Sequence, residues 1–368
     1  MLEELKRRSD VDLHVIIAGT AILPKYSAHH AHVKEMLTKD GFNNIYEVYF
    51  NLEGDKPIVK AKSTGLGIIE FSSLYDLIGP ELVVVRGDRF ETLAAASAAA
   101  LMNITVAHIE GGDVSGTLDE AIRHSITKLS HIHFATNDAS RNRIIQMGEH
   151  PDYVFNFGSP DLEVVMRLSK KGGTVDLRNT GSGAAIDPSD DYIIVSYHPV
   201  TTELEQLAEY TKALLGAVHE LKISAFWFWP NFDAGAEEKI SRELRVFNNK
   251  VRDHKIRFMR YLPPQDYLIL LRNARCFVGN SSSGLKECSY LGIPVVNIGS
   301  RQKGRARAEH VLDVVEDKKA IMEAVKLQLS HGPYNPSLVC TAKNTSRNIA
   351  KTLATVNLYI QKSFKDLK

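Results

Sequence analysis

The 368-residue sequence lacks the features that mark disulfide-rich, zinc-binding or membrane proteins. Its three cysteines, Cys276, Cys288 and Cys340, form no CxxC pair, which argues against a zinc site or a disulfide framework. No apolar run approaches the roughly 20 residues that span a bilayer, and the N-terminal MLEELKRRSD is unlike a signal peptide. The net charge of +1 gives no global attraction to nucleic acid or to an acidic membrane. We therefore expect a cytoplasmic protein that binds neither nucleic acid nor membrane and needs no metal.

Short β-branched runs alternate with longer helical patterns along most of the chain, which is typical of repeated βαβ units. Strands are expected at 12–19, 82–87, 104–110, 131–137 and 153–158 in the first half, and at 192–197, 224–229, 256–261, 276–280 and 294–299 in the second. Helices are expected at 1–9, 30–39, 66–78, 90–102, 118–130 and 138–147, and between the later strands. The pattern predicts an α/β protein with two Rossmann-like, doubly wound domains and a cleft between them.

The length of the chain also favours two domains, because one compact core rarely extends over 368 residues. A polar, glycine-rich stretch at 169–191 has no apolar periodicity, so we expect a flexible linker or a surface excursion there. The predicted domains are then 1–168 and 192–344, with a separate terminal segment at 345–368.

Charged residues follow two apolar runs of the first half at the point where each run ends. VVV at 83–85 leads into Arg86-Gly87-Asp88-Arg89, and ITVAHI leads into Glu110 and two glycines. Ligands of open parallel sheets bind beyond the carboxyl ends of the strands. Asp88, Arg89 and Glu110 are therefore candidate site residues at one edge of the first sheet, unless they are solvated loop residues.

The predicted helix at 118–130 adds a third carboxylate. Thr117 and Glu120 fit a capping box that starts this helix, which places Asp119 in its first turn. The helix dipole there favours an ionised carboxylate, and Arg123 lies one turn further along. Asp119 is then either a site carboxylate or a residue that only stabilises the helix end.

The second half contains groups that suit an anion. The strand YIIVSY ends at His198, which is either a ligand contact or a structural histidine. The strand CFVGN opens into NSSSG at 280–284, where backbone amides and hydroxyls could bind phosphate, although the spacing is not that of a Walker loop. Four basic residues then follow 294–299, and they suit either a nucleic acid or a second contact with a diphosphate: Arg301, Lys303, Arg305 and Arg307. Without interleaved aromatic residues, the diphosphate is favoured.

Together these segments resemble the UDP-N-acetylglucosamine 2-epimerase family, and in particular its hydrolysing branch in sialic-acid-type pathways. The resemblance covers about residues 10 to 360 and rests on six motifs: GDRFE (87–91), HIEGGDVSGTLDEAIRHSITKLSH (108–131), HPVTTE (198–203), PNFDAG (230–235), GNSSSGLKE (279–287) and GSRQKGR (299–305). It implies a fold like that of the B-type glycosyltransferases, in which the second domain holds the nucleotide and the last helix crosses back to the first domain.

The resemblance also implies a reaction and its residues. The reaction is elimination of UDP from UDP-N-acetylglucosamine to a 2-acetamidoglucal, followed by addition of water to give N-acetylmannosamine or a close analogue, without a cofactor. By resemblance Asp88, Glu110 and Asp119 are the catalytic carboxylates, supported by Arg89 and Arg123. The implied UDP-binding residues are His198, Asn231, Ser281, Ser282, Glu287 and Arg301. A homodimer or homotetramer is expected.

The chain departs from the family pattern at its start. The family begins with a strand and a TGTRADY-like loop, whereas this sequence opens on MLEELKRRS, which looks like the following helix. We expect either that the natural start is missing or that part of the site has been lost, which leaves an inactive nucleotide-sugar-binding subunit as an alternative. A B-type glycosyltransferase is the other alternative. Without a strand between them, the runs at 12–19 and 82–87 must leave a gap or pair directly.

Overall fold

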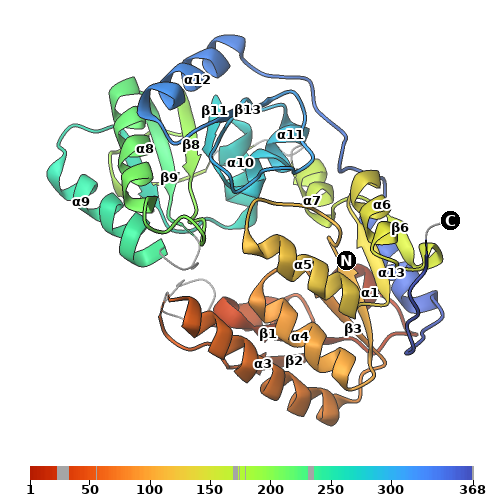
Figure 1. Ribbon diagram of the computed structural model, residues 1–368. Coiled ribbons are helices and arrows are strands. Elements are labelled where there is room, and N and C mark those ends of the chain that lie inside the picture. Colours follow the sequence, from red (N-terminus) through yellow and green to blue (C-terminus); the bar gives the residue numbers. More distant parts are fainter. Residues whose placement is uncertain are drawn as a thin grey trace. The chain divides into compact units, whose positions relative to one another are not determined.

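The computed structural model of the chain divides into two compact units (Figure 1). It describes residues 1–22, 33–54, 56–168, 173, 175–178, 180–230 and 236–366. The first unit consists of Met1–Val114, Leu118–Glu163 and Cys340–Lys368, and the second of Ser115–Thr117 and Val164–Val339. None of the helices in the described ranges is long and apolar enough to cross a membrane.

The first unit alternates strands and helices, and all of its paired strands run parallel. Its elements are α1 (Leu2–Lys6), β1 (His14–Ala18), the 3-10 turn η1 (Gly19–Ile22), α2 (Val33–Lys39), β2 (Asn44–Val48), α3 (Pro57–Ile78), β3 (Leu82–Arg86), α4 (Phe90–Leu101), β4 (Thr105–Ile109), α5 (Leu118–Leu129), β5 (Ile132–Ala135), α6 (Asp138–Gln146), the 3-10 turn η3 (Pro151–Tyr153), β6 (Val154–Asn156) and α13 (Thr345–Thr355). α7 (Pro160–Leu168) lies at the border of the two units. Part of the helix predicted at 30–39 falls outside the described residues.

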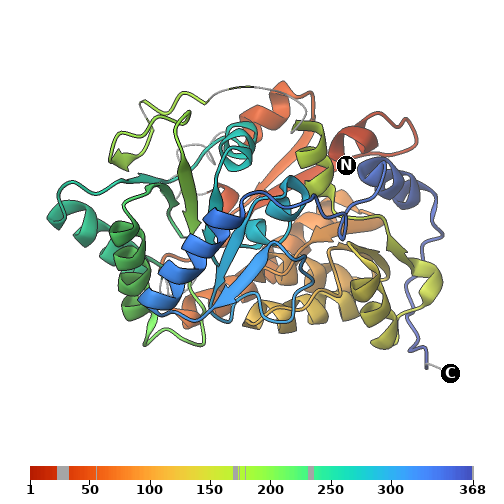
Figure 2. The same ribbon diagram turned by 90° about the horizontal axis from the view of Figure 1, so that it is seen from above.

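Helices cover both faces of the sheet that contains β3. Successive side chains of a strand point to opposite faces, so alternate residues of β3 pack against different helices. Val83 and Val85 of β3 belong to one cluster with α3 and α4, and Leu82 and Val84 belong to another with α1 and α13. α3 and α4 approach closely because Gly67 faces the alanine-rich side of α4. Figures 1 and 2 both show α13 beside α1.

The strands β1 and β3 do not pair with each other. β1 pairs only with β2, while β3 belongs to a sheet of order β3-β4-β5-β6. Among the described residues no backbone hydrogen bond joins β1 to β3. Of these two strands only Ile17, Val83 and Val85 are buried, whereas every residue of β4 is buried. Of the two arrangements expected for 12–19 and 82–87, the structure therefore has the unpaired one.

The second unit has one sheet of seven strands in the order β13-β12-β11-β8-β9-β10-β7. Its elements are β7 (Ser182–Gly183), β8 (Tyr192–Ser196), α8 (Leu207–Leu221), β9 (Ser224–Phe228), the π-helix η4 (Ala236–Ser241), α9 (Arg242–Lys250), β10 (Ile256–Met259), α10 (Pro264–Arg272), β11 (Cys276–Gly279), the 3-10 turn η5 (Ser282–Gly284), α11 (Glu287–Leu291), β12 (Val295–Ile298), β13 (Val311–Val314) and α12 (Lys318–His331). All its strands run parallel except β7.

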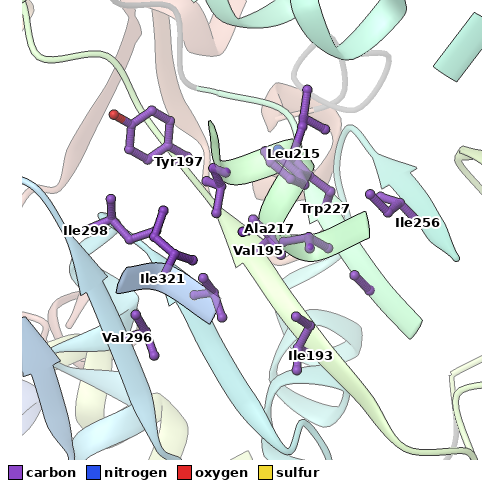
Figure 3. Close-up of a cluster of buried hydrophobic side chains, with 14 of the residues drawn as sticks. Ile193, Val195, Tyr197, Leu215, Ala217, Trp227, Ile256, Val296, Ile298 and Ile321 are labelled. Carbon is purple, nitrogen blue, oxygen red and sulfur yellow. The ribbon is translucent and has the colours of Figure 1, made fainter. Parts of the chain in front are cut away.

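Both faces of this second sheet are buried. Ile193 and Val195 of β8 pack with α8 and α12 in one cluster, which Figure 3 shows in close-up. Tyr192 and Ile194 of the same strand pack with α10 on the opposite face. The continuous apolar runs that predicted these strands are thus explained by helices on both faces.

Part of the stretch expected to be a flexible linker or a surface excursion packs against the second unit. Val175 and Leu177 are buried in the cluster beneath α10, and β7 pairs antiparallel with β10. The guanidinium of Arg257, on β10, donates to four backbone carbonyls of this segment: those of Leu177, Arg178, Thr180 and Ala184. Its backbone thus finds partners that lie more than 70 residues away, which local composition could not reveal.

Candidate functional site

The residues predicted at the first sheet edge follow two neighbouring strands. β3 and β4 pair in parallel with Arg86 opposite Ile109, and the amide of Gly87 donates to the Ile109 carbonyl at 3.0 Å. Asp88 and Glu110 therefore leave the sheet at adjacent points, as the sequence predicted.

Asp88 forms an ion pair with Arg123 of α5. The Arg123 side chain is only 2% exposed, and its Nη1 also donates to the backbone carbonyl of Asp113 at 2.8 Å. The Asp88 side chain keeps 25% of its surface exposed. A buried guanidinium thus fixes a carboxylate that remains open to a ligand.

Glu110 has a left-handed backbone, with φ of 68°. A residue other than glycine in this region carries strain on the order of 1–3 kcal/mol, and such strain is concentrated at functional sites. The Glu110 amide donates to the Phe134 carbonyl at 2.9 Å, and its carboxylate accepts from the Ser159 hydroxyl at 3.2 Å. Arg86, which also pairs with Asp161, lies 3.4 Å from the same carboxylate. Burial opposes the charge of Arg86, but the two carboxylates raise its pKa.

Asp119 and Arg89, which were also predicted for this site, have different surroundings. Asp119 is in the first turn of α5, half-buried and one turn before Arg123. Within the described part of the chain it makes no ion pair or hydrogen bond, so its carboxylate is available. Arg89 donates to Glu91 at 3.1 Å and contacts the ring of Phe90.

In the second unit, His198 and Asn280 bond to each other reciprocally. The amide of His198 donates to Asn280 Oδ1 at 2.7 Å, and Asn280 Nδ2 donates to the His198 carbonyl at 2.9 Å. The Asn280 carbonyl in turn accepts from Arg301 at 3.1 Å and from Gln302 at 2.8 Å. The ends of β8, β11 and β12 are therefore joined around Asn280, which brings His198 and Arg301 to one place.

Part of the serine loop, in which we expected amides and hydroxyls to bind phosphate, is a closed turn. Ser281 caps the turn η5 by accepting from the amide of Ser283, and the next three amides, those of Gly284, Leu285 and Lys286, donate to carbonyls within the turn. The amides of these four residues are therefore used within the turn and are unavailable to a phosphate. Ser281, Ser282 and Glu287 follow β11 in the chain and are half-buried, whereas Asn231 lies outside the described residues.

The basic residues after β12 do not act alike. Arg307 is held by Asp313 and by the carbonyls of Arg305 and Gln302, so its role is structural. Arg305 donates to Gln302 at 2.9 Å. Arg301 is bonded to the carbonyl of Asn280, next to the serine loop.

Sequence reasoning missed several polar residues that support the carboxylates. His108 bonds to the carbonyl of Gly87, Thr127 lies beside His108, and Ser159 bonds to Glu110. A polar residue inside a buried apolar run is the one available signal, and His108 in ITVAHI provides it. Ser159 comes from a segment 49 residues away and has no such signal.

Comparison with known proteins identifies the family. Residues 3–354 match the family model described as UDP-N-acetylglucosamine 2-epimerase. The chain is 30% identical over 374 residues to the UDP-N-acetylglucosamine 2-epimerase of Neisseria meningitidis serogroup B, covering 100% of this chain and 94% of that protein. It is 31% identical over 361 residues to the UDP-N,N'-diacetylbacillosamine 2-epimerase (hydrolyzing) of Legionella pneumophila, covering 98% and 93%.

A solved structure shows the same fold. The UDP-GlcNAc 2-epimerase of Methanocaldococcus jannaschii, in complex with UDP-GlcNAc and UDP, matches with a TM-score of 0.74 at 18% identity, covering 96% of this chain and 94% of that one. The predicted α/β fold with parallel, Rossmann-like sheets is confirmed. The chain belongs to the UDP-N-acetylglucosamine 2-epimerase family.

Proposed function

We propose that the protein is a hydrolysing 2-epimerase that converts UDP-N-acetylglucosamine, or a close 2-acetamido analogue, to UDP and the free 2-acetamido-mannose-type sugar. The observation that carries the proposal is the pair of carboxylates at adjacent strand ends, Asp88 held by Arg123 and Glu110 held by Ser159. The Legionella relative is named as a hydrolysing enzyme, which supports this branch of the family.

The chemistry requires two proton transfers and the departure of a diphosphate. In the first step a base removes the C2 proton while the C1–oxygen bond breaks, which yields UDP and a 2-acetamidoglucal. In the second step the oxygen of water bonds to C1 and a proton is returned to C2 on the opposite face. Carboxylates are suited to both transfers, and we assign them to Asp88, Glu110 and Asp119 jointly.

The second unit supplies groups for the nucleotide. The C2 proton is weakly acidic, so charge that develops on the leaving diphosphate must be stabilised. Arg301 is the cation assigned to this role, together with the hydroxyls of Ser281 and Ser282. His198, positioned by Asn280, is assigned to the diphosphate, and Glu287 to the uridine nucleotide. Asn231 is kept as a nucleotide-binding candidate from its motif alone.

The test is incubation with UDP-N-acetylglucosamine in deuterated water. We expect release of UDP and a free sugar with deuterium at C2, because solvent supplies the returned proton. Release of UDP without deuterium at C2 would instead indicate a transferase or a simple hydrolase, and absence of any UDP release would indicate a binding subunit. The same assay with the UDP-N,N'-diacetylbacillosamine of the Legionella relative separates the two substrates.

A matched pair of variants tests the site. Asp88→Asn removes a carboxylate paired with Arg123, and Asp191→Asn removes an exposed one paired with Arg275 at 3.2 Å. Only Asp88→Asn should abolish incorporation of deuterium. Equal loss in both variants would contradict the assignment.

A further inference from the structure

We propose that His108 and Thr127 are positioning residues for Asp88, and that they act by fixing the peptide bond that precedes it. This inference rests on the proposed function, because Asp88 has a catalytic role only there. Neither residue need touch the substrate.

The three groups form one chain of hydrogen bonds. His108 is in β4 and its side chain is fully buried. Its Nε2 lies 2.8 Å from the carbonyl oxygen of Gly87, and its Nδ1 lies 3.2 Å from the hydroxyl of Thr127 on α5. This chain of hydrogen bonds, which we call the relay, therefore runs from Thr127 on α5 through His108 on β4 to Gly87, the residue before Asp88.

The chemistry of the partners sets the tautomer. Burial lowers the pKa of His108 to about 4, so the imidazole is neutral at physiological pH. A carbonyl only accepts, so Nε2 must carry the single ring proton and donate to Gly87. Nδ1 is then an acceptor, and the Thr127 hydroxyl donates to it. The Arg123 carbonyl also lies 2.9 Å from this hydroxyl, and the single hydroxyl proton goes to Nδ1 in place of that carbonyl, because Nδ1 carries no proton and the carbonyl still accepts the backbone bond of the helix.

Packing alone does not hold the Gly87 peptide. Gly87 has φ of +79°, and a Cβ built on it would meet no atom within 4 Å. Its orientation depends instead on β4, because the Gly87 amide donates to Ile109 and its carbonyl accepts from His108. The Gly87 carbonyl is part of the peptide bond to Asp88, so loss of the His108 donor releases that peptide and lets the Asp88 backbone rotate.

α5 thus fixes Asp88 at two points. Arg123 holds the carboxylate, and Thr127, one turn along the same helix, orients the histidine that holds the backbone. A small displacement of a catalytic group costs up to about 100-fold in rate while the substrate still binds. We therefore expect the relay to affect kcat and to leave KM nearly unchanged.

The kinetic test uses isosteric variants with a matched control. Thr127→Val removes the hydroxyl and keeps the shape. Thr211→Val does the same to a threonine of α8 that is equally buried and whose hydroxyl likewise lies within hydrogen-bond distance of the carbonyl four residues earlier. We expect kcat for UDP release to fall about 10-fold or more in Thr127→Val, with KM within about threefold, and to stay unchanged in Thr211→Val. His108→Phe should lose more, and His108→Gln, which retains a donor, should recover part of the loss.

A spectroscopic test does not depend on activity. In protein with 15N-labelled histidine, the His108 signals, assigned from their loss in His108→Gln, should show a proton on Nε2 at neutral pH. Thr127→Val should shift Nδ1 through loss of its donor. A proton on Nδ1, or a kcat in Thr127→Val equal to that of the unchanged protein, would overturn the relay. Absence of UDP release from the unchanged protein would overturn the proposed function. The protonated nitrogen of His108 would still show whether the hydrogen bonds of the relay exist.

Discussion

Glu149 offers the sharpest test of the energetics, because its carboxylate is almost completely buried among three donors. The side chain is 1% exposed, and it accepts from Lys128 at 2.5 Å, from Lys362 at 2.7 Å and from His133 at 3.1 Å. Lys362 belongs to the C-terminal segment of the first unit, so this carboxylate ties that segment to α5 and β5. Glu149→Gln keeps the size of the side chain and removes its charge.

The size of the contribution that ionised Glu149 makes to the unfolding free energy follows from its pKa. Burial alone would raise the pKa of Glu149, but the hydrogen bonds and charges of its partners lower it from 4.5 to about 2. That difference corresponds to roughly 3 kcal/mol of unfolding free energy. Because the folded state has the lower pKa, the contribution is complete above about pH 4.5 and is lost as the pH falls towards 2. Glu149→Gln should therefore destabilise strongly at pH 7 and little near pH 2.

The assay must report on the first unit. Both tryptophans, Trp227 and Trp229, lie in the second unit, so their fluorescence is the internal control. Hydrogen exchange of the β5 amides, measured as a function of urea concentration, gives the unfolding free energy of the first unit at each pH. Glu47→Gln removes a partly exposed partner of Lys34 and should cost no more than about 1 kcal/mol. A loss below about 1 kcal/mol in Glu149→Gln at pH 7, or a loss independent of pH, would refute the reasoning.

Three further predictions concern the first unit. Asp88→Asn, Glu110→Gln and Asp119→Asn should each slow UDP release by at least about 100-fold. Calorimetry should show Asp88→Asn alone to be destabilised, by about 3 kcal/mol, because it breaks an ion pair with the buried Arg123. Gly112→Ala should lower the urea midpoint of unfolding more than Gly79→Ala. Both glycines have positive φ, but of the two only Gly112 would bring a Cβ into overlap with backbone atoms, those of Ser140. Equal midpoints would argue against this close packing of Gly112 on Ser140. Amides of β1 and β3 should exchange faster than those of β4, and equal protection would mean that β1 and β3 are paired in solution.

The sequence predicted strands well where burial on both faces produces a continuous apolar run. β4, β5 and β8 are buried along their whole length, and each was predicted. β2, with the sequence NIYEV, is only partly buried and was missed, because its polar residues interrupt the run. β7 has two residues and exists through its pairing with β10, which no local pattern encodes.

The sequence predicted the site carboxylates that follow strands, but not the residues that donate hydrogen bonds to them. Asp88 and Glu110 follow apolar runs, and the rule for parallel sheets places them together. The use of the serine-loop amides within η5 could not be read from NSSSG, because glycine and serine form either a tight turn or an open cradle. The donors that orient the carboxylates come from α5 and from residue 159, so they appear only when the chain is folded.

The position of Asp88 is finally a consequence of how α5 packs. Ile122, Ile126 and Leu129 bury one side of this helix against the core of the first unit. The apolar contacts fix its rotation, and with it the direction of Arg123 and Thr127, both almost fully buried. Any slip of the helix about its axis would move the carboxylate and the peptide of Asp88 together. The geometry at the reacting groups is thus set by apolar contacts that never meet the substrate, because a polar group is only as well placed as the element that carries it.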